Sequence, residues 1–215
     1  AVTKADREVL EAAEFAFRHI ITRDAAYGLM VTSQRKSLHR LAAEWITKRS
    51  AQLGGETPWG LLAYHHDHAD TSEMALDCYE KAGQAAVDGF ANREAVAFFS
   101  RALEIAEAIG ATDKLRIAKI HAGLARAHHH MTNYPVARET YAKALEGFGA
   151  PTPRGKFATI MRLLGGVMTQ GFRRWRKPVT PVDDPIQMAI ITNTRLWQEA
   201  ALFMGDALTS LAGIY

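Results

Sequence analysis

The sequence predicts an all-α fold, a solenoid built from stacked helical hairpins. The first observation is a stripe in which an alanine, an aromatic residue and a second alanine stand at positions i, i+4 and i+7 of a helix. Two such stripes, 42 residues apart, are Ala95, Phe99 and Ala102, and Ala137, Tyr141 and Ala144. Small residues beside an aromatic ring give a face that a neighbouring helix can approach closely. The second observation is composition, because alanine is abundant and only 7 of 215 residues are proline, which favours helix.

The composition is that of a globular protein with a mild charge. Hydrophobic residues make up 48% of the chain and charged residues 23%. The formal net charge of +3 neither demands nor excludes a polyanionic partner. A single cysteine, Cys78, rules out a disulfide within the chain, so we expect a reducing compartment, the cytoplasm. The sequence shows no N-terminal signal pattern and no apolar run of about 18 residues that could span a bilayer.

Residues 1–55 are predicted to form a small N-terminal segment of helices with one extended stretch. The alternating aromatic residues over 15–21 suit a short strand or an extended edge. Thr22 is expected to cap a helix over 23–30, and Ser33 to open a second helix over 34–49 that ends at Gly54. The apolar stripe expected on this second helix consists of Leu38, Leu41, Ala42, Trp45 and Ile46.

Five helices follow between residues 57 and 148, as the first part of a second region, residues 56–215. Their predicted starts are Thr57 before Pro58, Thr71 or Ser72, Asn92, Asp113, and Asn133. The first helix carries Trp59, Leu62, Ala63 and His66 at the spacing of a tetratricopeptide A-helix. Stripes start at Ala75, Ala95 and Ala137, 20 and then 42 residues apart, whereas a regular tetratricopeptide array repeats about every 34 residues. The prediction is therefore a tetratricopeptide-like array with helices longer than the standard ones.

The tail is predicted to add one more repeat unit after two irregular linkers, near 150–156 and 178–185. Asp183 and Asp184 precede Pro185 and are expected to cap a helix over 186–203 with Trp197, Ala200 and Ala201 on its inner side. A last helix begins at Ala207 and reads as unfinished, so we expect the chain to be a piece of a longer protein. Its apolar residues Leu208, Leu211 and Ile214 would then be exposed and favour self-association.

A basic cluster ends the helix predicted over 154–170. Its members are Arg173, Arg174, Trp175, Arg176 and Lys177. An apolar helix with such an end has the composition of an interfacial membrane segment. The alternative is a helix packed on the array with a solvated end anchored by tryptophan. We favour packing over contact with a membrane surface, because amphipathicity is what any surface helix shows.

One string near the N-terminus resembles a known family. Residues 17–27, FRHIITRDAAY, followed by residues 34–40, QRKSLHR, are similar to a recurring segment of bacterial multidomain ATPases of the STAND type. These include adenylate/guanylate cyclases in which an AAA-like ATPase precedes helical repeats. The resemblance implies that residues 1–55 are a winged-helix-like segment that follows a nucleotide-binding domain and precedes repeats. It also implies an arginine-rich insert between repeat helices near Arg173, which supports packing of the tail.

A basic helix in a winged-helix-like context raises DNA as an alternative partner. Arg35, Lys36 and Arg40 supply the positive charge. They share their helix with an apolar stripe, so we favour a solvated outer face over contact with nucleic acid.

Two histidine clusters are the candidates for a metal site. His65, His66 and His68 surround Asp67, and His65 and His68 share a helix face. The consecutive residues His128, His129 and His130 fan out around their helix, so they do not converge on one ion. A transition-metal site would need ligands from both clusters, and we therefore predict no metal and no cofactor. The sequence also lacks a phosphate-binding glycine loop and a nucleophile motif, so we predict no catalytic residues and no enzyme.

The predicted function is that of a non-catalytic sensor or scaffold. Stacked hairpins leave a concave surface for a protein or peptide, or for a neighbouring domain of the parent chain. The residues expected to line it are Tyr64, His65, His68, His121, Arg126 and His128. The resemblance implies that this segment regulates an ATPase, or a cyclase, of a larger signalling protein. The alternative is the repeat region of an ATPase-type transcriptional regulator that binds DNA elsewhere in the parent.

Overall fold

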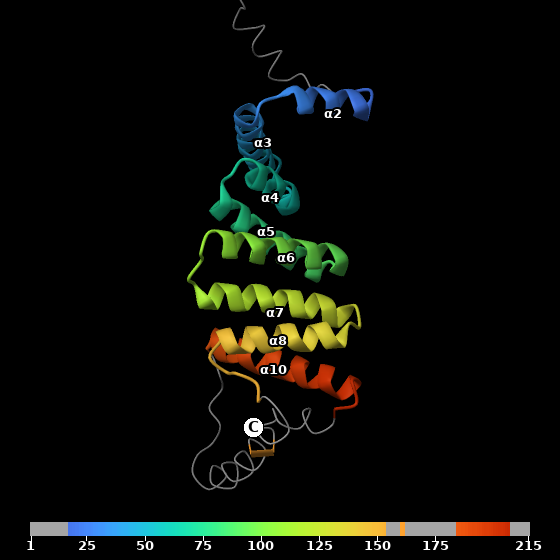
Figure 1. Ribbon diagram of the computed structural model, residues 1–215, viewed down its shortest axis with the longest axis vertical. Coiled ribbons are helices and arrows are strands. Elements are labelled where there is room, and N and C mark those ends of the chain that lie inside the picture. The colour runs from blue at the N-terminus through green and yellow to red at the C-terminus, as the bar shows by residue number, and fades with distance from the viewer. Residues whose placement is uncertain (1–16, 154–159, 162–183, 207–215) are drawn as a thin grey trace, which may run out of the picture.

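The computed structural model shows a stack of α-helices that follow one another in chain order (Figure 1). It describes residues 17–153, 160–161 and 184–206. The helices are α2 (Ile20–Leu29), α3 (Thr32–Leu53), α4 (Trp59–His68), α5 (Ser72–Asp88), α6 (Asn92–Ala108), α7 (Lys114–His130), α8 (Tyr134–Gly147) and α10 (Pro185–Phe203). These residues contain no strand. The predicted all-α helical-repeat solenoid is confirmed.

The alanine–aromatic stripes form the core that joins the helices. Tyr79, Phe99 and Tyr141 are buried, and so are the alanines that flank each of them on the same helix face. Phe99 of α6 inserts between two glycines, Gly83 of α5 and Gly123 of α7. A Cβ at Gly83 would lie 2.8 Å from the Phe99 ring, and one at Gly123 would lie closer still. These two positions must therefore lack a side chain if α5, α6 and α7 are to pack around one ring.

The turns between helices share one backbone pattern. A residue with positive φ ends α4, α5, α6, α7, α8 and α10, and the amide after it donates to the carbonyl five residues back, as in a Schellman motif. At the end of α7, Thr132 has φ 58° and the Asn133 amide donates to the His128 carbonyl at 2.9 Å. This recurrent turn sets a common geometry for successive hairpins.

The same turn explains why several expected side-chain caps are absent. Asn133 accepts no capping hydrogen bond at the start of α8, and Asn92 is the first residue of α6 and not its cap. At α4 the N-cap position is taken by Pro58 and not by Thr57. Asn133 has ψ 65°, outside the extended conformation from which a cap side chain reaches back to the helix. Asp113 and Asp184 have ψ of 92° and 118°, and their carboxylates accept from the amides of Arg116 and Ile186.

The N-terminal expectations need correction. The predicted extended stretch is wrong for Ile20 and Ile21, which form the start of α2, and His19 takes the N-cap position expected for Thr22. The stripe expected inside α3 is mostly solvent-exposed, because a different stripe, His39, Ala43 and Ile46, faces α4. Both stripes have helical spacing, and the one that contains Ala43 is the one that packs against α4. The winged-helix-like domain stays a prediction.

The tail is described in part. The cap at Asp184 and the inner side of α10, with Trp197, Ala200 and Ala201 buried, are confirmed. The helix predicted over 154–170 is described at 160–161 alone. The basic cluster 173–177 and the last helix from 207 lie outside the described residues, as does most of the linker predicted near 178–185. No helix in the described ranges is long and apolar enough to cross a membrane.

Candidate partner-binding surfaces

Helices α5 and α7 lie side by side on one face of the array and are joined by polar contacts. Arg116 of α7 reaches three acidic side chains of α5, namely Glu73, Asp77 and Glu80. Toward the C-terminal ends of both helices, the Arg126 guanidinium donates to the side-chain amide oxygen, Oε1, of Gln84 at 3.2 Å. Contact between helices two apart in the chain is what a superhelical stack of hairpins produces on its inner face.

An open hollow lies between α5 and α7. It is lined by Glu80, Lys81, Gln84, Phe99, Lys119 and Ile120. Burial raises the pKa of the Glu80 carboxyl, and the Arg116 guanidinium that contacts it opposes this rise. Lys119 is exposed, and Lys81 lies with its Nζ 4.4 Å from the centroid of the Trp59 ring. The hollow thus combines apolar walls with two ammonium groups, an amide and a carboxylate, which is an arrangement suited to a polar peptide.

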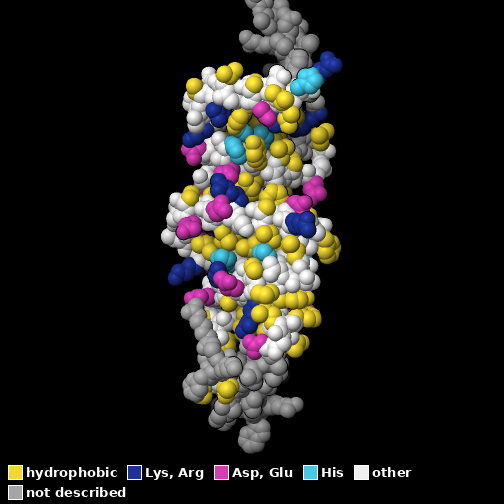
Figure 2. Space-filling view, turned by 45° about the vertical axis from the view of Figure 1, so that its right-hand side comes forward, with side chains coloured by type: hydrophobic (Ala, Val, Ile, Leu, Met, Phe, Trp, Pro, Cys, Tyr) yellow, Lys and Arg dark blue, Asp and Glu magenta, His cyan; other side chains and the backbone are white. Residues whose placement is uncertain are grey.

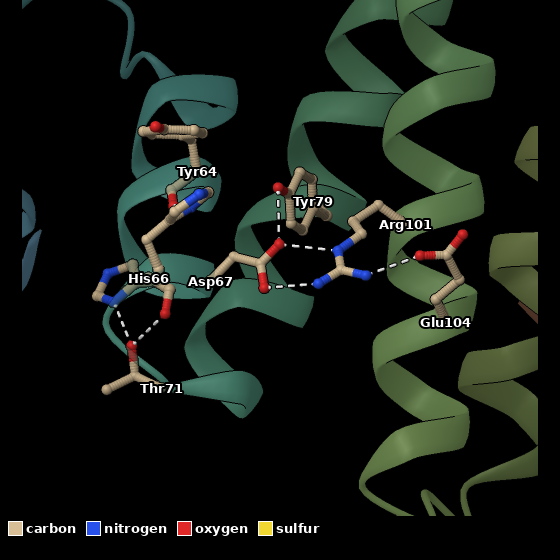
Figure 3. Close-up of polar contacts among 8 residues, drawn as sticks. Tyr64, His66, Asp67, Thr71, Tyr79, Arg101 and Glu104 are labelled. Atoms are coloured by element: carbon tan, nitrogen blue, oxygen red, sulfur yellow. Dashed lines mark hydrogen bonds and ion pairs between the residues drawn. The ribbon is translucent and has the colours of Figure 1, made fainter. Parts of the chain in front are cut away.

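The region of His66 and Asp67 fastens α4 to α5 and α6. The Arg101 guanidinium of α6 donates two hydrogen bonds to the Asp67 carboxylate, from Nε to Oδ2 at 2.8 Å and from Nη2 to Oδ1 at 2.9 Å (Figure 3). The Tyr79 hydroxyl donates to the same carboxylate at 3.2 Å. The hydrogen bond from Arg101 is the main reason why the pKa of Asp67 is lowered, and burial is the main reason why that of Tyr79 is raised, to about 12. This cluster is structural, because each polar group is satisfied within the protein.

Three of the six candidate residues belong to a cluster of histidines and tyrosines at the α2–α3 end. His39 Nδ1 lies 2.9 Å from His65 Nδ1, and His39 Nε2 lies 3.0 Å from the Tyr27 hydroxyl. The His68 ring lies against the Tyr64 ring, with centroids 4.1 Å apart and planes tilted by 36°. Figure 2 shows histidines among hydrophobic side chains toward this end of the array. Tyr64, His65 and His68 therefore pack against α3, away from the α5–α7 hollow.

The other candidate residues lie on two sides of α7. Arg126 faces α5, as described above. His121 lies near Lys143 of α8, and its Nδ1 atom and that of His128 are buried without a hydrogen-bond partner within the described part of the chain. The structure therefore does not bring the six candidates together. Among the residues described, no three histidine, cysteine, aspartate or glutamate side chains are placed to hold a metal ion.

Sequence reasoning missed the residues that line the hollow. The helices that carry Lys81, Gln84 and Lys119 were predicted in the right order. The candidate residues were nevertheless chosen mostly among the histidines, because of the chemistry of the imidazole side chain. The regular spacing of Glu73, Asp77 and Glu80 on α5 was the signal that could have marked this face. It became informative only once α7 placed Arg116 opposite those three carboxylates.

The geometry defines an all-helical repeat fold with an open hollow between alternate helices, in which charged and amide groups stand beside apolar walls. Residues 92–149, which include α6, α7 and α8, match the tetratricopeptide repeat family. Repeats of this family generally mediate protein–protein interaction. No curated protein and no solved structure matches the chain.

Proposed function

We propose that the chain is a non-catalytic scaffold that binds a segment of a protein partner across α5 and α7. The observation that carries the proposal is the hollow between these helices, where Lys81 and Lys119 stand beside an amide and an apolar floor. The match of the adjacent helices to tetratricopeptide repeats supports it, because such repeats bind proteins. Two ammonium groups at the hollow favour a segment that carries carboxylates.

The resemblance of residues 17–40 to STAND-type ATPases extends the proposal to regulation. In a longer signalling protein, the partner would bind one arrangement of the array more tightly and so change the turnover of an ATPase or cyclase domain. Deleting residues 56–215 from that protein should change its nucleotide turnover. Unchanged turnover in the presence of the partner would contradict a regulatory role while leaving the binding site open to its own test.

Binding is tested with a displayed library of random peptides selected against the 215-residue chain. We expect the selected peptides to be rich in aspartate and glutamate and to bind about tenfold more weakly to the Lys81→Ala and Lys119→Ala variants. Lys143→Ala, which removes an exposed ammonium group from α8, is the matched control and should leave the affinity unchanged. Equal affinity for all four proteins would contradict the proposed site.

A further inference from the structure

The outer face of α3 carries an apolar seam that nothing in the described part of the chain covers. Leu38, Leu41 and Trp45 stand at i, i+3 and i+7 and are 48%, 60% and 55% exposed. The opposite stripe of the same helix, His39, Ala43 and Ile46, is buried against α4. Helix α3 therefore has two packing faces, of which the described structure uses one.

The seam has the geometry of a helix–helix contact. Apolar residues at i, i+3 and i+7 are the a and d positions of a two-helix seam, into which one partner helix inserts its own side chains. The next seam positions on either side are polar, Gln34 four residues before Leu38 and Lys48 three residues after Trp45, which limits the apolar part to about two turns. An interfacial membrane helix would need a broader apolar face than three side chains in a single row. The seam therefore fits a helix better than it fits a lipid surface.

Position in the fold points the same way. A helical solenoid stays soluble when its end helix presents a polar outer face. Among the described residues, helix α3 is the first long helix of the stack, and α2, which precedes it, buries none of its own residues (Figure 1). An apolar seam at this point is what an internal helix of the stack would show, so the covering helix would continue the array by one layer.

The excess of basic side chains around the seam favours an acidic covering helix. Residues 17–55 contain seven basic side chains and two acidic ones, Asp24 and Glu44. Lys48 and Arg49 prolong the seam by one turn, are exposed, and form no ion pair with other described residues. A second copy of the same face would bring like charges together, which disfavours self-pairing. Acidic side chains beside an apolar stripe would instead complement this surface.

We propose that the α3 seam docks an amphipathic helix whose apolar stripe is flanked by aspartate or glutamate. Leu38, Leu41 and Trp45 supply the apolar contact, and Lys48 and Arg49 fix the register and direction of the incoming helix. This site is separate from the α5–α7 hollow and does not depend on the function proposed for it.

The test uses two designed peptides of about three heptads with leucine at a and d. One carries glutamate at e and g and the other lysine, so that like-charge repulsion keeps each peptide from pairing with itself. Isothermal titration of the 215-residue chain should show micromolar binding of the glutamate peptide and at least about tenfold weaker binding of the lysine peptide. Leu41→Gln and Arg49→Glu should each weaken the glutamate peptide by about tenfold or more.

The matched control is Leu61→Gln, which makes the same exchange at a leucine of α4 that is 49% exposed and off the seam. It should bind like the parent chain, and Lys119→Ala in the hollow should do so too. Circular dichroism of each variant confirms that the helices persist. The proposal is overturned if the glutamate peptide does not bind, or if it binds equally well to Leu41→Gln.

Two rival occupants are settled by the same variants. Binding to vesicles that contain phosphatidylserine, lost in Leu41→Gln, would overturn the proposal in favour of a membrane surface. A dimer by light scattering that becomes monomeric in Leu41→Gln would overturn it in favour of a second copy of this chain.

Discussion

The ring of Phe99 in α6 lies directly against the backbone of Gly123 in α7, in the space that a Cβ at position 123 would occupy. Gly123→Ala should therefore destabilise the protein by about 1–3 kcal/mol, because the buried ring has to move. Urea unfolding followed by circular dichroism measures the loss. Gly28→Ala in α2, where a Cβ meets nothing within 4 Å, is the control and should be neutral or slightly stabilising. Equal effects of the two exchanges would contradict the close contact.

The Asp67 carboxylate should contribute more to stability than an exposed acid that binds the same arginine. Asp67→Ala leaves the Tyr79 hydroxyl and the Nε and Nη2 groups of Arg101 without this acceptor, and we expect a loss of about 1–3 kcal/mol. Glu104→Ala removes an exposed partner of Arg101, and we expect a loss below about 1 kcal/mol. Thermal or urea unfolding of both variants gives the comparison. A larger effect at Glu104 would show that Asp67 does not fasten α4 to α6.

Acid should weaken the contact between α3 and α4. Burial lowers the pKa of His39 and of His65 below the ordinary value of 6.5, and the neighbouring His68 adds to both shifts. The folded state thus holds fewer protons than the unfolded chain, so this contribution to stability is complete above pH 6.5 and is lost as the pH falls through the lowered pKa values. The two Nδ1 atoms share one hydrogen bond, and protonating both rings would leave two donors facing each other.

The other groups around these rings bear on the same titration. They are the Tyr27 hydroxyl, His66, Asp67 and the exposed pair of Lys36 and Asp70. The measurement is the free energy of unfolding between pH 8 and 5, for the parent chain and for His39→Gln, which removes one titrating ring. The pH dependence should be smaller in the variant. If the two curves run parallel, other histidines govern the acid loss.

A glycine should improve the turn between α7 and α8. Thr132 is a β-branched residue with φ 58°, a conformation that costs an L-residue about 1–2 kcal/mol. Thr132→Gly removes this cost, although the added freedom of the unfolded chain takes back about 0.5–1 kcal/mol. We expect a net gain of up to about 1 kcal/mol in urea unfolding. Gly110→Thr makes the reverse exchange in the equivalent turn after α6, where φ is 64°, and should destabilise.

Local pattern was enough to predict the helices because their alanine–aromatic stripes contact immediate neighbours in the chain. Ala95, Phe99 and Ala102 were placed in the core correctly, and Asp113 and Asp184 were placed correctly as caps. The hydrophobic pattern predicted the wrong buried stripe for α3, because the stripe that is buried contains a histidine and the exposed seam contains leucine and tryptophan. Which stripe is buried depends on the neighbour that covers it.

The candidate site was harder to predict because it depends on contacts between helices two apart. Spacing on α7 does not tell which side faces α5, and so Arg126 and His121 were grouped although they lie on different sides. Lys81 and Lys119 are 38 positions apart and meet at one hollow only through the superhelical stacking of α5 and α7.

The function that we propose depends on a segment of a partner protein binding in the α5–α7 hollow. Its most direct test is amide chemical-shift mapping of the chain with a library-selected acidic peptide. We expect the shifts to concentrate at Lys81, Gln84 and Lys119 and to become smaller in Lys119→Ala at the same peptide concentration. Shifts confined to helices other than α5 and α7, unchanged by that substitution, would contradict it.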